Sequence, residues 1–287
     1  MTKEKIINDR KLLEIFKKMC IIRYFEKEVI KAYNIGKINT PVYLSIGQES
    51  ISATISEFFK PDLIFAQHRG HSVYLAFGGD RIKLIDELLG KETGCCNGKG
   101  GSPPIQDDNI GMIGHHGLIG ENVPLAVGAA LGARDKKIYC VFGDGAAEED
   151  YVFTSISFAK SHNLSVLFVC EDNNLSILTK KCERRNWELS DALKGIGMNS
   201  VNISDDPYEI ATNITKFKEK LPAFLNIKTC RHNWHVGVNS DGDPEQDRLQ
   251  IVKDDLIKKG FLEEIEKIEN ETKKELEEIW QERLEKQ

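Results

Sequence analysis

The sequence contains no apolar run long enough to cross a bilayer, and its first ten residues, MTKEKIINDR, lack the apolar core of a signal peptide. We therefore expect a cytoplasmic protein without a membrane partner.

Positive charge is not in excess either, because the chain has 39 Lys and Arg residues and 45 Asp and Glu residues, for a formal net charge of −6. This balance disfavours a nucleic-acid partner, since a phosphate backbone attracts basic surfaces.

Paired cysteines of the C-x-x-C type are also absent. The chain has seven cysteines, an odd number, with Cys95 and Cys96 adjacent and the others scattered. Such spacing predicts reduced thiols rather than disulfides or a zinc site.

The chain does have 287 residues with a hydrophobic content of 40%, enough to bury a sizeable core. Apolar residues recur at helical spacing over residues 9–33, with Gly36 as the stop, over residues 51–59, and over residues 262–284. The first segment predicts an N-terminal helix. The last predicts an amphipathic C-terminal helix whose many charges form a solvated face.

Three β-rich runs, at residues 137–142, 164–170 and 223–229, are separated by helical patterns. Strands that are apolar throughout and alternate with helices are typical of parallel sheets covered on both faces. We therefore predict an α/β fold with a mostly parallel sheet and helices on both faces, as a single domain over residues 1–287.

Two further segments are unusual in composition. Residues 93–120 are rich in glycine, and loops of this length are usually functional or disordered; the isoleucines within it favour order. Residues 122–134, NVPLAVGAALGAR, form a helical pattern with small side chains. Because glycine costs about 1 kcal/mol relative to alanine inside a helix, these glycines indicate close packing against another element, in this chain or in a partner.

The stretch CVFGDGAAEEDYVFTS places a single carboxylate, Asp144, between two glycines where a strand ends and a helix begins. The next apolar strand ends at EDNN, one strand–helix–strand unit later, so Asp144 and Asn173 are expected at neighbouring strand ends. Carboxylate and amide oxygens suit Mg²⁺, which also takes phosphate oxygens as ligands. With helix N–H groups expected near Ala146, the sequence predicts a Mg²⁺–diphosphate site.

The motifs SIGQES, HRGH, GKGGS, GLIGENVPLAVGAALGAR, GDGAA and CEDNN, in this order, resemble the alpha subunit of the thiamine-diphosphate-dependent 2-oxo acid dehydrogenase decarboxylating component. The pyruvate and acetoin dehydrogenase branch is the most similar. The resemblance extends from about Leu12 to the C-terminal helix. It implies a thiamine-diphosphate-binding fold, with thiamine diphosphate and Mg²⁺ as cofactors.

The resemblance also implies a metal site formed by Asp144, Asn173 and the backbone carbonyl of Leu175. Asn174 stays open as an alternative to Asn173, because the family usually has two asparagines at 172–173 and this chain has Asp172 before the pair. The other cofactor-binding positions implied by the resemblance are His68, Arg69, Gly117, Ile119, Gly145, Ala146, Arg231 and His235.

Two histidines take catalytic roles in this resemblance: His71 facing the reacting carbon, and His235 in the loop TCRHNWHVGVNSDGDP. The loop departs from the family pattern at Asn233, where a histidine is usual, and at Val236, where a phosphorylatable serine is usual. Its glycines and scarce apolar anchors predict a segment, residues 231–243, that is mobile without ligand.

The function implied is decarboxylation of a 2-oxo acid, or cleavage of an acetoin-type substrate, with acyl transfer to a lipoyl carrier. A beta-like subunit would complete the cofactor site in a heterotetramer, and a lipoyl acyltransferase is the further partner to test for. The alternative is a transketolase-like or acyloin-forming biosynthetic enzyme with the same cofactor. A structural or regulatory subunit without cofactor is a third class, and the presence of Asp144, Asn173 and Arg69 argues against it.

Overall fold

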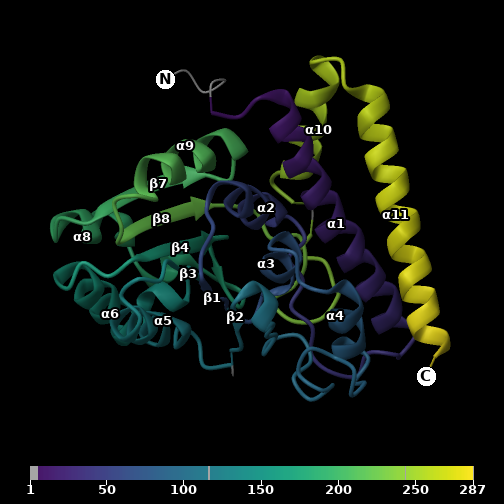
Figure 1. The fold of residues 1–287 in the computed structure, drawn as a ribbon, viewed down its shortest axis with the longest axis horizontal. Helices are drawn as coiled ribbons and strands as arrows, with labels where there is room; N and C mark the ends of the chain where they lie inside the picture. The colour runs from purple at the N-terminus through teal and green to yellow at the C-terminus, as the bar shows by residue number, and fades with distance from the viewer. Residues whose placement is uncertain (1–5, 116, 243, 287) are drawn as a thin grey trace.

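A six-stranded sheet forms the centre of the molecule in the computed structural model, which describes residues 6–115, 117–242 and 244–286 (Figure 1). The strand order is β2-β1-β3-β4-β8-β7, and every neighbouring pair is parallel. The strands are β1 (Leu63–Phe65), β2 (Met112–Ile113), β3 (Ile138–Gly143), β4 (Val166–Asp172), β7 (Asn199–Ser204) and β8 (Ala223–Lys228). The predicted α/β fold with a parallel sheet is confirmed.

The three predicted strands correspond to β3, β4 and β8, and the other three strands of this sheet were not predicted. Nor were β5 (Leu175–Ser176) and β6 (Thr179–Lys180), which form a separate two-stranded sheet. β1 and β2 have only 3 and 2 residues, too few for a periodic signal. β7 reads NSVNIS, and its polar residues are tolerated because it lies at the edge of the sheet beside β8.

Helices cover both faces of the sheet. Alternate residues of β3 face opposite ways: Val141 joins one buried apolar cluster and Phe142 the other. The larger cluster packs against α1, α2, α9 and their neighbours, and the smaller one against α5, α6 and α8 (Figure 1). The helices are α1 (Asp9–Asn34), α2 (Glu49–Phe58), α3 (His71–Ala76), α4 (Arg81–Leu88), α5 (Asn122–Gly132), α6 (Asp150–Ser161), α7 (Lys181–Arg184), α8 (Leu189–Gly195), α9 (Pro207–Phe217), α10 (Arg248–Lys258) and α11 (Leu262–Glu285).

The glycine-rich loop that was expected to be ordered is organised by one buried carboxylate. Glu87 accepts hydrogen bonds from the backbone N–H groups of Cys96 at 2.6 Å, Gly98 at 2.9 Å, Gly100 at 2.7 Å and Gly101 at 3.0 Å. These bonds fold the loop around the end of α4.

All seven cysteines are free thiols, as predicted.

The small-residue helix α5 presents an open outer face. A Cβ added at Gly128 or Gly132 would meet nothing within 4 Å, and Leu125 on the same helix is 49% exposed. The opposite face of α5 buries Ala126 and Ala130 in the smaller cluster, but no described residue of this chain packs closely against Gly128 and Gly132.

The amphipathic helix α11 lies beside α1 along one side of the molecule (Figure 1). Its apolar face buries Trp280, whose ring centroid is 5.6 Å from that of Phe25 on α1. Most of its charged residues are exposed, which confirms the predicted solvated face. Within the part of the chain that the structure describes, no helix is both long and apolar enough to span a membrane.

We predict that Trp280→Ala lowers the free energy of unfolding by about 3–5 kcal/mol, because it removes a fully buried indole between two helices. Lys274→Ala, on the same helix but with a side chain that is 77% exposed, should change it by less than about 0.5 kcal/mol. Urea denaturation measures both values. Equal effects of the two substitutions would show that α11 does not contribute to the core in this way.

Candidate active site at the carboxyl edge of the sheet

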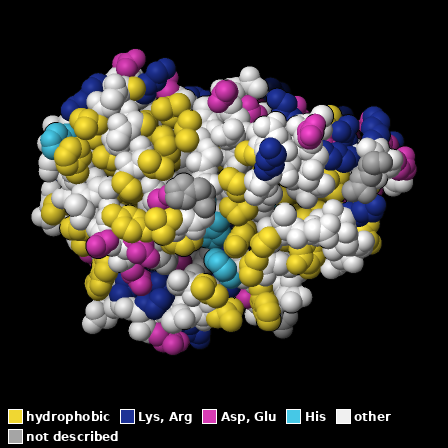
Figure 2. Space-filling model, turned by 90° about the horizontal axis from the view of Figure 1, so that it is seen from below, with side chains coloured by type: hydrophobic (Ala, Val, Ile, Leu, Met, Phe, Trp, Pro, Cys, Tyr) yellow, Lys and Arg dark blue, Asp and Glu magenta, His cyan; other side chains and the backbone are white. Residues whose placement is uncertain are grey.

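The predicted site residues meet where the central strands end. Gly143 at the end of β3 is the parallel partner of Glu171 near the end of β4, so the segments that follow the two strands start side by side. A cavity of about 180 Å³ opens there. It is lined by Gln67, His68, Arg69, Ile119, Gly143, Asp144, Gly145, Ala146, Glu149, Asn173, Leu175, Ser176, Ile177, Arg231 and His235. Figure 2 shows histidine side chains in the middle of this face, among hydrophobic ones.

Ten of the predicted residues therefore share one cavity: His68, Arg69, Ile119, Asp144, Gly145, Ala146, Asn173, Leu175, Arg231 and His235. Asn174 does not line it, which favours Asn173 as the oxygen ligand. Gly117 does not line it either.

The oxygen-rich end of the cavity consists of Asp144, Asn173 and Leu175. The Asn173 Oδ1 atom accepts a hydrogen bond from the Leu175 backbone N–H at 3.1 Å, and this turn brings both residues to the cavity wall. Asp144 is 1% exposed. Burial and the nearby Asp172 carboxylate raise the pKa of Asp144, although Arg184 opposes the shift. A cation at this position would offset that unfavourable burial, so the donor set fits a hard divalent metal.

A guanidinium neutralises Asp144 in the structure. Arg184, at the end of α7, places Nη2 at 2.5 Å from Asp144 Oδ2, and Arg185 donates from Nη1 to the Asp144 carbonyl at 3.1 Å. This contact was not predictable from the sequence, because α7 is only four residues long and leaves no periodic pattern. A metal bound to Asp144 would share the carboxylate with Arg184 or displace it.

Position 145 favours glycine because a side chain there would crowd Ser176, and not because its φ is unusual. A Cβ there would lie 2.7 Å from Ser176 Oγ. The helix expected to begin near Ala146 begins instead at Asp150 as α6, and residues Ala146–Glu148 form a 3₁₀ turn. The backbone of Gly145 and Ala146 still lines the cavity.

Two arginines make the other end of the cavity cationic. Arg69 is 3% exposed and donates from Nη1 to the Leu44 carbonyl at 2.7 Å. Arg231 is held by Asp241 at 2.6 Å and donates to the Ile177 carbonyl at 3.0 Å. Burial, together with the charge of Arg231, lowers the pKa of Arg69 to about 10, so Arg69 stays charged at neutral pH. Two guanidinium groups in one small cavity suit a diphosphate.

Two neutral histidines, His68 and His235, line the same cavity. The ring centroids of His68 and His235 are 5.2 Å apart, and that of Tyr43 is 4.9 Å from His68. Burial and the charges of Arg69 and Arg231 lower the pKa of His235 to about 4. Burial, followed by Arg69, lowers the pKa of His68 well below its ordinary value. Each neutral ring offers one donor and one acceptor nitrogen at pH 7.

His71 does not reach this cavity. It begins α3, is fully buried, and places Nδ1 at 3.0 Å from Glu26 Oε2 and Nε2 at 2.8 Å from Ser102 Oγ. Because both ring nitrogens are occupied inside the protein, the geometry disagrees with the expectation that His71 faces the reacting carbon. The His71 ring instead connects the glycine-rich loop to α1.

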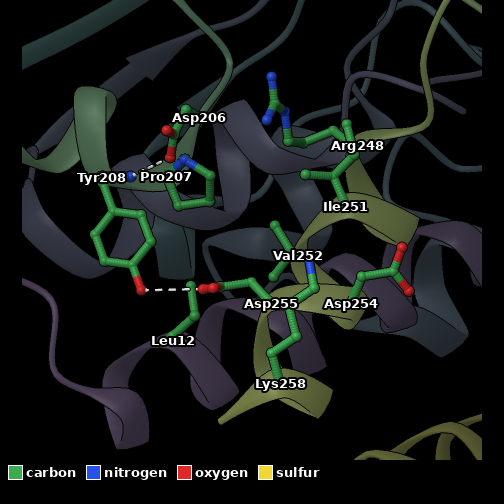
Figure 3. A pocket seen from close by; sticks show the side chains of 10 residues that line it. All are labelled: Leu12, Asp206, Pro207, Tyr208, Arg248, Ile251, Val252, Asp254, Asp255 and Lys258. Atoms are coloured by element: carbon green, nitrogen blue, oxygen red, sulfur yellow. Dashed lines mark hydrogen bonds between the residues drawn. The ribbon is translucent and has the colours of Figure 1, made fainter.

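A larger, shallower pocket of about 460 Å³ lies between α1, α9 and α10 (Figure 3). Two of its polar groups are already paired: Tyr208 bonds to Asp255 at 3.3 Å, and Arg248 pairs with Asp205, outside the pocket lining, at 2.7 Å. No residue predicted for the site lines it, and its groups form no constellation for acid–base or metal chemistry.

Comparisons with known proteins bear on the family of this chain. The family model described as dehydrogenase E1 component matches residues 17–287. The alpha subunit of acetoin:2,6-dichlorophenolindophenol oxidoreductase from Cupriavidus necator is 36% identical, over 85% of this chain and 76% of that protein. The mitochondrial pyruvate dehydrogenase E1 component subunit alpha from Solanum tuberosum is 26% identical, over 90% of this chain and 72% of that protein.

Among solved structures, a transketolase from Campylobacter jejuni superposes with a TM-score of 0.61 at 18% sequence identity. The match covers 98% of this chain but 49% of the transketolase, so this chain spans about half the length of that protein. At this identity the likeness concerns the fold. The family match over most of the chain, and the identity to the acetoin enzyme subunit, confirm the resemblance seen in the motifs: this chain belongs to the dehydrogenase E1 component family.

Proposed function

We propose that this chain is the alpha subunit of a thiamine-diphosphate-dependent enzyme that decarboxylates a 2-oxo acid or cleaves an acetoin-type substrate. One observation carries the proposal: a single cavity at the carboxyl edge of the sheet combines the oxygens of Asp144, Asn173 and Leu175 with the guanidinium groups of Arg69 and Arg231. An oxygen-lined metal position next to two arginines matches the charge of a metal–diphosphate group. The names of the relatives favour this function over the transketolase-like or acyloin-forming alternative.

Each residue has a role that follows from its position. Asp144, Asn173 and the Leu175 carbonyl hold Mg²⁺, while Arg69 and Arg231 hold the diphosphate. When bound, the thiazolium ring of the cofactor supplies a carbon nucleophile and an electron sink. His235, neutral and half-buried at the cavity, accepts or donates a proton at a ring nitrogen.

A beta-like subunit completes the site in this proposal. Hydrophobic side chains around the cavity are exposed to an extent unusual for a finished active site: Ile177 by 59%, Leu178 by 62% and Trp234 by 45%. The open face of α5 offers a further contact surface, whether to that subunit or to a second copy of this chain. We place the assembly, a heterotetramer, in the cytoplasm and expect it to pass its acyl group to a lipoyl carrier on an acyltransferase.

We expect no decarboxylase activity from the purified chain alone, and activity when the beta-like subunit is added. The reason is that the exposed side of the cavity leaves the cofactor and the reacting carbon open to water. Carbon dioxide release from candidate 2-oxo acids, measured with thiamine diphosphate and Mg²⁺, tests this. Turnover by the chain alone would contradict the two-chain proposal.

Asp144→Ala should abolish Mg²⁺-dependent binding of thiamine diphosphate without unfolding the protein, because a strand-end carboxylate is a ligand and not part of the core. Titration calorimetry on the two-chain complex measures the affinity. Asp150→Ala, which removes an exposed carboxylate nearby on α6, is the control and should leave it unchanged. Unchanged affinity in the Asp144→Ala variant would exclude the assigned metal site.

The low pKa of His235 predicts a pH-dependent effect on stability. Folding lowers this pKa from 6.5 to about 4, so the unfolded chain binds more protons than the folded chain in that window. This group therefore reduces the free energy of unfolding as the pH falls through the window. His235→Asn should remove the penalty and gain stability relative to the wild type at acid pH.

Urea denaturation of both proteins, above pH 6.5 and near pH 5, measures the difference. Burial raises the pKa of Glu171 to about 7 and produces a slope of the opposite sign, but it affects both proteins equally. A difference between the two proteins that stays constant with pH would refute the assigned pKa shift.

A further inference from the structure

A chain of hydrogen bonds runs from a buried carboxylate to Asn173. Gln48, at the start of α2, donates from Nε2 to Glu171 Oε2 at 3.2 Å. Its Oε1 atom accepts from Asn173 Nδ2 at 2.9 Å. Gln67, from the cavity wall, donates to the same Glu171 Oε2 at 3.3 Å. Gln48 and Glu171 are each 1% exposed, so no solvent competes for these bonds.

The chemistry of these groups gives the chain a direction. Glu171 Oε2 accepts N–H bonds from both Gln48 and Gln67, and an oxygen that accepts a hydrogen bond from an amide faces the amide nitrogen, not its oxygen. Gln48 must therefore turn its nitrogen toward Glu171 and its oxygen toward Asn173. Asn173 must in turn present its nitrogen to Gln48. The Asn173 oxygen is left for the cavity side, where it also receives the Leu175 N–H.

We propose that Gln48 and Glu171 are positioning residues that fix the Asn173 amide so that its oxygen, and not its nitrogen, faces the metal. The inference rests on the proposed Mg²⁺ site and deepens it. An asparagine amide is nearly symmetric in shape, and a reversed amide would point two N–H donors at a cation. Partners of this kind behind a metal ligand affect metal affinity strongly.

The test uses Mn²⁺ in place of Mg²⁺, on the chain assembled with its partner subunit and saturated with thiamine diphosphate. The dissociation constant of Mn²⁺ is read from the electron paramagnetic resonance signal of the free ion. Gln48→Met keeps the shape but removes the amide, and should weaken Mn²⁺ binding roughly 10–100-fold. Glu171→Met, which removes the acceptor that sets the direction, should weaken it as well.

Gln246→Met is the matched control. The Gln246 amide likewise donates to a buried carboxylate, Asp205 Oδ1, at 3.2 Å, but Gln246 does not line the cavity, so Mn²⁺ affinity should change by less than about threefold. Circular dichroism of every variant checks that the fold persists.

The Gln48→Met substitution, made in an Asn173→Asp variant, distinguishes positioning of the Asn173 amide from simple packing of the Gln48 side chain. Asn173→Asp offers an oxygen to the metal in either orientation, so it no longer needs a fixed amide. In that background Gln48→Met should alter Mn²⁺ affinity by less than about threefold. An equal loss of Mn²⁺ affinity in both backgrounds would mean that Gln48 acts only through packing, which would overturn the proposal. Unweakened Mn²⁺ binding by Gln48→Met with Asn173 present would overturn it as well. Failure of the wild-type complex to bind Mn²⁺ would instead overturn the proposed function, and the inference with it.

Discussion

The site depends on the parallel pairing of β3 with β4. Six residue pairs, from Ile138↔Val166 to Gly143↔Glu171, hold the two strands in one register. Their side chains are apolar on both faces and packed by helices on each side, so a slip by one residue would exchange the residues of the two buried clusters. This register brings Asp144 and Asn173 to one edge of the sheet, where parallel α/β proteins bind their ligands.

The charges at that edge of the sheet determine which kind of ligand can bind there. Arg69 and Arg231 add positive charge to the cavity wall, while burial and the same charges hold His235 in its neutral form. Asp144 is a buried carboxylate at the same edge, and its charge is balanced by Arg184. The cavity is therefore suited to a group that carries both signs, as a metal bound to a diphosphate does.

Much of this arrangement was predictable from the sequence, because it depends on order along the chain. Uniformly apolar segments predict neighbouring parallel strands. A carboxylate that follows one strand and an amide that follows the next are then expected to meet at the sheet edge. Contacts across the fold were not predictable. The family resemblance implied that His71 faces the reacting carbon, but α3 begins at His71 and its ring bonds inward to Glu26 and Ser102.

The loop of residues 231–243 illustrates the same limit. Its composition predicts mobility, yet its backbone bonds to a distant segment: His232 N to the Ile46 carbonyl at 3.1 Å and Gly237 N to the Val42 carbonyl at 2.8 Å. Asp243 lies outside the described residues, and the response of the loop to ligand stays a prediction.

The most direct test of the site is a crystal structure of the two-chain complex with thiamine diphosphate and Mn²⁺, using anomalous scattering. We predict a Mn²⁺ peak bonded to Asp144, Asn173 and the Leu175 carbonyl. A peak elsewhere, for example at Glu87 beside Cys95 and Cys96, with none at Asp144, would contradict the account.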